Sequence, residues 1–235
     1  MVAHVNTATV VGLEAEVVDV EADVTNGLPA TVIVGLPDAA VQESKERVRS
    51  ALKNSELKYP QTRVSVNLAP ADTQKIGTQF DVPIALAILL ASEQCAFNVK
   101  NRWFVGELSL DGTLRHTDGI LSMVLLARDQ SYDTVFVPEV DGAEAALVDG
   151  VQVIPVPSLA LLIAHLRGDF LLPGAKQAIR TSCSRGNGPY DLSAVRGQTY
   201  TQVGACRGAI CARRCGQGPV REGAVWRRSS VPGVR

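Results

Sequence analysis

The first 177 residues of this 235-residue chain contain a single cysteine, Cys95. A body with one thiol does not depend on disulfides, which fits a reducing compartment. The longest apolar run, residues 83–91, is about half as long as a bilayer span. The N-terminus has neither a basic start nor a sustained apolar stretch, so it does not resemble a secretory leader. We therefore expect a cytoplasmic protein that has no part in a membrane.

The chain also lacks the string G-x-x-x-x-G-K-[ST], whose backbone N–H groups and Lys hold nucleotide phosphates. The segment GLPD (residues 35–38) follows a predicted strand and opens a predicted helix. Without the glycine spacing or a Lys, this segment is interpreted as a helix cap. We expect no cofactor in this chain.

Basic residues are unevenly distributed. Residues 178–235 hold ten Arg, no Lys and two acidic residues, whereas residues 1–177 hold 13 basic and 22 acidic residues. This tail also contains four of the five cysteines, Cys183, Cys206, Cys211 and Cys215. Their spacing lacks the paired Cys-x2-Cys of zinc modules, and no His follows His165, so no metal site is predicted. The tail has no apolar period that could bury a face, and we expect it to be disordered.

Periodicity predicts strands that alternate with helices. Segments that alternate or are rich in β-branched residues are expected as strands at 8–11, 16–24, 31–34, 63–68, 103–108, 134–137 and 151–156. Helical patterns occupy 38–53, 82–92, 119–130, 142–148 and 158–166. An Asp111-Gly112 turn predicts a hairpin over 108–114. The pattern indicates an α/β fold with a mixed sheet (α+β) in one domain, residues 1–172.

Two helices are the most distinct. In the helix over 38–53, Asp38 is expected to cap the N-terminus, and one face carries an apolar stripe. The opposite face carries charged side chains that are interpreted as solvated. These are Glu43, Lys45, Glu46, Arg47, Arg49 and Lys53. The helix over 82–92 is apolar nearly all round and should be central, with Asp81 and Pro83 at its start. An acidic body with only local basic groups does not favour DNA binding by this domain.

Four long motifs carry a family likeness: NGLPATVIVGLPDAAVQESKERVRSALKNSELKYP (26–60), VNLAPADTQKIGTQFDVPIALAILLAS (66–92), FVGELSLDGTLRHTDGIL (104–121) and VPSLALLIAHLRG (156–168). Together they resemble the N-terminal domain of the ComM/YifB family of magnesium-chelatase-like AAA+ ATPases. The resemblance implies the fold of the second domain of a small-subunit ribosomal protein and of the Lon protease proteolytic domain. It also implies ATP, magnesium, a homo-hexameric AAA+ ring and DNA as cofactors and partners of a separate ATPase module. The family acts in natural transformation and recombination by branch migration.

The segment DLSAVRGQ (191–198) resembles the family motif that leads toward the ATPase module. The Arg-rich, Lys-free sequence that follows is typical of a GC-rich gene read out of frame. We therefore expect residues 173–198 to be a linker and residues 199–235 to be non-native sequence.

The resemblance to Lon protease identifies candidate catalytic positions. KIGTQFD (75–81) is similar to the Lon-type K-D-G-P-S-A-G, and its nucleophile position falls on Gln79. The general-base Lys position falls on or near Leu121, in a stretch without Lys. Because an amide cannot attack a peptide carbonyl, both halves of the dyad are missing and no catalytic residue is predicted. An active Lon-like Ser-Lys peptidase and a magnesium-chelatase-related subunit remain the alternatives to a non-catalytic accessory domain. The three histidines, His4, His116 and His165, are interpreted as surface or packing residues.

Overall fold

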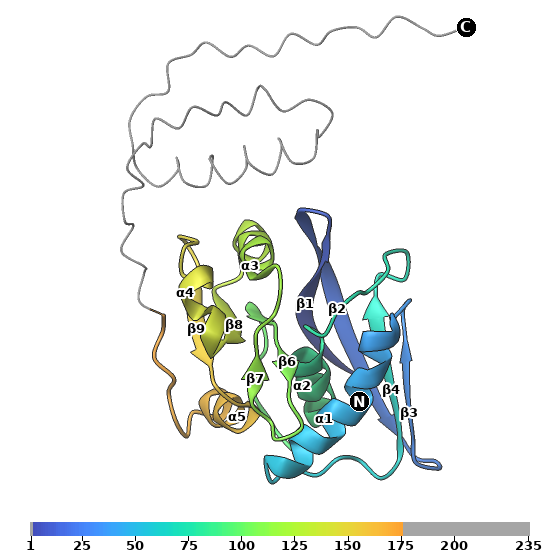
Figure 1. The fold of residues 1–235 in the computed structure, drawn as a ribbon. Helices are drawn as coiled ribbons and strands as arrows, with labels where there is room; N and C mark the ends of the chain where they lie inside the picture. The colour runs from blue at the N-terminus through green and yellow to red at the C-terminus, as the bar shows by residue number, and fades with distance from the viewer. Residues whose placement is uncertain (1, 176–235) are drawn as a thin grey trace, which may run out of the picture. The chain divides into compact units, whose positions relative to one another are not determined.

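The structure, a computed structural model, describes residues 2–175, and its longest strands form one mixed sheet. This sheet has the order β1-β2-β4-β3, with β1 Ala3–Val11, β2 Glu14–Thr25, β4 Arg63–Ala69 and β3 Ala30–Val34. The first two neighbouring pairs are antiparallel, whereas β3 and β4 are parallel (Figure 1). The parallel pair is joined through a helix, as a crossover connection requires.

A second sheet is entirely parallel, with the order β5-β8-β9. Its strands are β5 Arg102–Phe104, β8 Thr134–Pro138 and β9 Gln152–Val156. The single strand expected over 103–108 is wrong. Strand β5 ends at Phe104, and after Val105, whose N–H still donates to Phe136 of β8, the Gly106 N–H donates to the Gln79 carbonyl instead. The next residues pair as the predicted hairpin.

The hairpin consists of β6 Glu107–Leu108 and β7 Leu114–Arg115, which pair antiparallel across the Asp111-Gly112 turn. Gly112 has φ +87°, a left-handed conformation that favours glycine at this turn position. The hairpin prediction is therefore confirmed.

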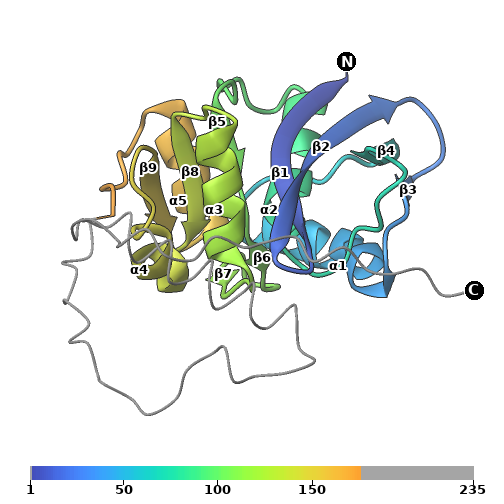
Figure 2. The same cartoon turned by 90° about the horizontal axis from the view of Figure 1, so that it is seen from above.

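Five α-helices lie among the described residues, and the views from two sides in Figures 1 and 2 place α1 and α3 at opposite sides of the β1–β2 pair. Their bounds are α1 Ala39–Asn54, α2 Asp81–Ala91, α3 Ile120–Asp129, α4 Gly142–Ala145 and α5 Leu159–Arg167. A short 3-10 turn, Glu139–Asp141, precedes α4. The helix expected over 142–148 is shorter than predicted, since α4 ends at Ala145.

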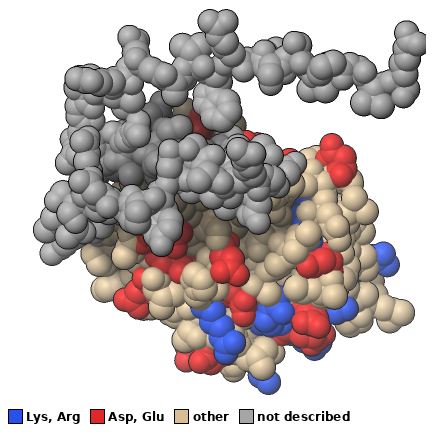
Figure 3. Space-filling model, turned by 45° about the horizontal axis from the view of Figure 1, so that its top comes forward, with Lys and Arg blue, Asp and Glu red and all other residues tan. Residues whose placement is uncertain are grey.

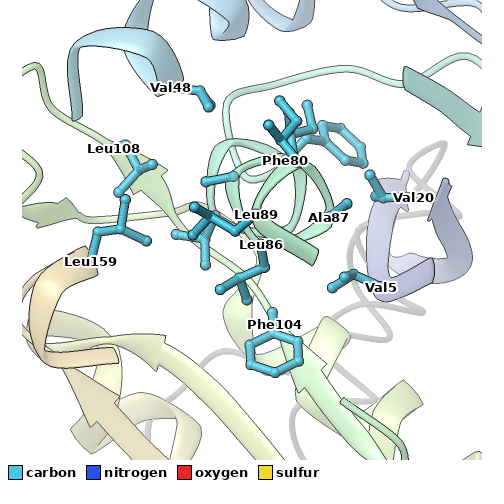
Figure 4. Close-up of a cluster of buried hydrophobic side chains, with 14 of the residues drawn as sticks. Val5, Val20, Val48, Phe80, Leu86, Ala87, Leu89, Phe104, Leu108 and Leu159 are labelled. Atoms are coloured by element: carbon cyan, nitrogen blue, oxygen red, sulfur yellow. The ribbon is translucent and has the colours of Figure 1, made fainter. Parts of the chain in front are cut away.

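Helix α2 is the centre of the main hydrophobic core. Every residue of it except Leu90 is buried, as its all-round apolar sequence predicted. Figure 4 shows side chains converging on it from several elements, among them Val20 of β2, Val48 of α1 and Phe104 of β5. Each fully buried Leu, Val or Phe side chain contributes roughly 1.5–3 kcal/mol, so this helix anchors the whole domain.

The parallel sheet buries both faces, and strict alternation along β5 assigns side chains to each. Phe104 points into the main core and stacks on Phe136, with ring centroids 4.9 Å apart. Trp103 and Val105 point the other way, into a second cluster with α3 and α4. Burial on both faces is typical of parallel sheets.

The observed content of helices and mixed sheets confirms the α/β (α+β) class. The domain boundary at residue 172 stays a prediction, and Leu172 is itself buried, with its N–H donated to His165 Nδ1 at 2.9 Å. The sequence predicted to be non-native (199–235), the four cysteines Cys183, Cys206, Cys211 and Cys215, and nearly all of the predicted linker (173–198) lie outside the described residues. Within residues 2–175, no helix has both the length and the apolarity needed to cross a bilayer.

Candidate functional site

The loop of residues 75–81, between β4 and α2, holds the position that the family resemblance aligns with a nucleophile. Its first residue forms a parallel bridge with the chain entering α1: Asp38 N donates to the Lys75 carbonyl at 3.0 Å, and Lys75 N donates to the Leu36 carbonyl at 3.1 Å. The start of α1 and the approach to α2 are thereby joined.

Asp38 serves both segments with one carboxylate. Its Oδ1 accepts the Val41 N–H at 2.8 Å, which confirms the predicted cap of α1. Its Oδ2 accepts the Gly77 N–H at 3.2 Å. The GLPD segment is therefore a helix cap whose acceptor atoms are used by the protein itself. Gly35 is required there, since a Cβ at its φ of +98° would lie 2.2 Å from the Leu68 carbonyl oxygen.

Gln79 occupies the aligned nucleophile position and is 6% exposed. Its side-chain Nε2 donates to the Ile76 carbonyl at 2.8 Å, and its own carbonyl accepts the Gly106 N–H at 3.1 Å. The amide lies over Gly77, where a Cβ would come within 2.3 Å of Gln79 Oε1. The side chain therefore stabilises the conformation of its own loop.

Leu121, at the aligned general-base position, lies in the first turn of α3. It is partly buried and packs against the second cluster, with Ile120 and Val124 among its members. Phe80, beside Gln79, belongs to the main cluster instead. The assignment of Gln79 and Leu121 as a degenerate dyad stays a prediction.

Thr78 brings a hydroxyl next to Gln79, and the sequence had not singled it out. Its Oγ1 donates to a carboxylate oxygen of Glu107 on β6. The contact ties the loop to the hairpin and does not by itself activate a nucleophile.

Arg47 forms an ion pair with the buried Asp81, so the interpretation of Arg47 as a solvated residue is wrong. Arg47 Nε and Nη2 donate to Asp81 Oδ2 and Oδ1 at 2.6 and 3.0 Å. The Leu108 N–H also donates to Asp81, at 3.1 Å. Burial raises the pKa of the Asp81 carboxyl, and the hydrogen bonds from Arg47 oppose that rise. Helix α2 begins at Asp81 as predicted, but the carboxylate joins α1 and β6 instead of capping its own helix.

Lys75 is fully buried, a second feature that periodicity did not reveal. Its Nζ donates to the carbonyls of Thr73, at 2.7 Å, and of Pro70. Burial lowers the pKa of Lys75, while the charges of Asp72 and Glu16 act in the opposite direction. The ammonium group is thus hydrogen-bonded to the backbone of its own loop.

The three histidines lie apart from this loop. His4 Nδ1 donates to Asp19 Oδ2 at 2.9 Å on the exposed side of β1 and β2, with Glu21 close by. His116 pairs with the buried Asp141. His165 Nδ1 accepts the Leu172 N–H, and its ring packs against Phe136. Each therefore has a partner within the protein.

Residues 20–141 match the family model described as subunit ChlI of Mg-chelatase. The chain belongs to this magnesium-chelatase-like family, with ComM and YifB proteins. The matched range includes the loop of residues 75–81, helix α2 and Leu121, so the candidate positions lie within the part that defines the family.

Relatives in three bacteria extend the match. The competence protein ComM of Haemophilus influenzae is 37% identical over 194 residues, which cover 81% of this chain and 38% of the relative. YifB of Escherichia coli is 37% identical over 201 residues, 85% of this chain and 39% of YifB. An uncharacterised Mycobacterium tuberculosis protein is 40% identical over 192 residues, 81% of this chain and 38% of that protein. The chain thus spans about two-fifths of the length of these relatives.

Proposed function

We propose that residues 1–172 form a non-catalytic accessory domain of a ComM/YifB-type AAA+ ATPase, which regulates or directs assembly of the motor. The observation that carries the proposal is the state of Gln79. At the position that the resemblance aligns with a nucleophile stands a buried amide, bonded to the Ile76 carbonyl. An amide offers no nucleophile that a base could activate.

The remaining contacts of the loop support the same role. Asp38, Glu107 and Asp81 each accept hydrogen bonds that join the loop or α2 to a different element. Such cross-links suit a rigid domain that transmits force or position. They do not suit a site that must admit a substrate.

The cellular role in this proposal is taken from the relatives of the chain. One relative is named a competence protein. On that name and on the family resemblance, we propose that the chain acts in natural transformation and DNA recombination. In this proposal the ATPase module, with ATP, magnesium, the hexameric ring and DNA, belongs to the further length that the relatives have beyond this chain.

One alternative rests on the description of the family model, which names a subunit of Mg-chelatase. A magnesium-chelatase-related role predicts that the protein supports magnesium insertion into a porphyrin, read from the shift in porphyrin absorbance. The accessory-domain proposal predicts no such shift when the chain is added to a chelatase that lacks its homologous subunit.

The test uses the Haemophilus influenzae ComM protein with and without the region that matches this chain. Sedimentation should show a change in ring assembly, or steady-state assays a change in ATP hydrolysis, when that region is removed. Unchanged assembly and hydrolysis would contradict the accessory role. Cleavage of casein by this chain, lost in Thr78→Ala or Gln79→Ala, would contradict the non-catalytic part.

A further inference from the structure

A hollow of about 870 Å³ lies beside α1, and its lining includes neither the loop of residues 75–81 nor Arg47. Its walls are the second half of α1, the segment 57–62 and residues 91–94 at the end of α2. We propose that this hollow binds a small organic phosphate through Arg49, Lys53 and Lys58. The inference goes beyond the proposed accessory function.

The charge of the lining points to an anion. Arg49, Lys53 and Lys58 line the hollow, and Glu93 is the one carboxylate among its lining residues. Residues 1–175 carry 22 acidic and 12 basic residues, so a hollow with three cations runs against the charge of the domain. On the face drawn in Figure 3, acidic side chains are widely scattered, while Lys and Arg gather mostly in the lower part of the view.

These three cations differ from Arg47 of α1 and Arg128 of α3. Arg47 and Arg128 form ion pairs with carboxylates. Among the described residues, no ion pair is formed by Arg49, Lys53 or Lys58. Arg49 instead lies over the Tyr59 ring, with its Cζ 5.9 Å from the ring centroid. An incoming phosphate would therefore meet cations that are not already neutralised.

The wall of the hollow is held in place before any ligand arrives. The Gln94 side chain accepts the Lys58 N–H at 3.1 Å and donates to the Lys58 carbonyl at 2.6 Å. The Tyr59 hydroxyl bonds to Thr31 Oγ1 at 2.7 Å on the neighbouring strand. Preorganised walls lower the entropic cost of binding, so the hollow is suited to a defined ligand.

Two helices end at the hollow, and their carbonyl ends carry partial negative charge that would oppose an anion. At α1 these carbonyls already have donors: Ser55 N bonds to Ala51 and Leu52, and Glu56 N bonds to Lys53. At α2, Ser92 N bonds to the Ile88 carbonyl. With these carbonyls hydrogen-bonded, the formal charges of the lining are the three cations and the Glu93 carboxylate.

The size and lining favour a small ligand over a polymer. Val24, Leu57 and Ala91 add apolar surface to the lining, which suits the organic part of a phosphate ester. A nucleic-acid strand needs a longer track of cations to release its counterions, and the lining of the hollow supplies three. A small phosphate ester and a nucleic-acid strand both present phosphate groups, so the test compares one ligand of each kind.

The test titrates the full chain with AMP and, separately, with a short oligothymidylate, at low salt. Amide NMR shifts report the location of binding, which matters because the ten Arg of residues 178–235 also attract phosphate. We expect AMP to shift the amides of Lys58 and Gln94. Each of Arg49→Gln, Lys53→Gln and Lys58→Gln should weaken AMP binding about threefold, and the triple variant about thirtyfold, as exposed charge contacts predict.

Lys100→Gln is the matched control, since Lys100 is exposed and lies outside the hollow. It should leave AMP affinity unchanged. AMP shifts confined to residues beyond 178, or equal weakening by Lys100→Gln, would overturn the proposal. A tighter response to oligothymidylate that depends on the same three cations would overturn the choice of a small ligand.

Discussion

Arg47 of α1 donates two hydrogen bonds, 2.6 and 3.0 Å long, to Asp81 at the start of α2, although the two residues are 34 positions apart in the sequence. The Asp81 side chain has no exposed surface, whereas 17% of the Arg47 side chain is exposed. Because the Leu108 N–H completes this site, three elements meet at one carboxylate.

Arg47→Ala leaves the buried Asp81 charge without its partner and is expected to lower the free energy of unfolding by about 3 kcal/mol. Urea denaturation followed by circular dichroism measures the change. Glu43→Ala is the control, because Glu43 also pairs with Arg47, at 3.7 Å, but is 75% exposed. This variant should lower the free energy of unfolding by no more than about 0.5 kcal/mol. Equal effects of both variants would show that the pair does not hold the domain together.

Gly35→Ala is expected to cost about 3 kcal/mol, since strain at positive φ adds to a clash with the backbone. The added Cβ would lie 2.2 Å from the Leu68 oxygen. Gly12→Ala separates the two causes: its φ is +66°, but nothing lies within 4 Å of the added Cβ. Its expected cost is about 1 kcal/mol, and thermal unfolding ranks the two variants. A larger loss in the Gly12 variant would refute the close-approach explanation.

Two histidines should give the domain opposite responses to pH. The hydrogen bond to Asp141 raises the pKa of His116, so its contribution is full below the ordinary value and is lost as pH rises through the raised value. Burial, aided by Arg102, lowers the pKa of His165, so its contribution is full above the ordinary value and is lost as pH falls through the lowered one.

Urea midpoints from about pH 5 to about pH 8 test both histidines. His116→Gln should flatten the alkaline side of the profile, and His165→Gln should flatten the acid side. The same profile in the unmodified chain and both variants would rule out this assignment. His116 is 62% exposed, so salt should weaken its effect.

Gln79→Ser is expected to create no peptidase, because an unassisted Ser hydroxyl is a weak nucleophile. Adding Leu121→Lys places an unpaired amine in a partly buried cluster position, which is expected to destabilise the domain by a few kcal/mol. Fluorescent casein reports cleavage, and circular dichroism reports folding. Robust cleavage by the Gln79→Ser variant alone would mean that a general base lies near this loop.

Local patterns predicted most of the fold, and contacts distant in sequence account for the misses. Alternation placed the strands of the first sheet, and all-round apolarity placed α2 in the core. Helical periodicity gave Arg47 a polar face, but it carries no information on Asp81, 34 residues away. In the same way, Arg49, Lys53 and Lys58 become one lining only when the segment after α1 folds back. The break after Phe104 depends on a partner, the Gln79 carbonyl, outside the strand.

Strand β2 pairs with a near and a distant neighbour, and this has a consequence for the order of folding. It meets β1 across a two-residue turn, but its second half also pairs with β4, with Asp19 opposite Ala69. A hairpin closes in roughly 1–10 μs. The pairing of β2 with β4 also requires closure of the chain that contains β3 and α1, which makes it slower. We therefore expect the β1–β2 hairpin to form first and β4 to pair with it in a slower step.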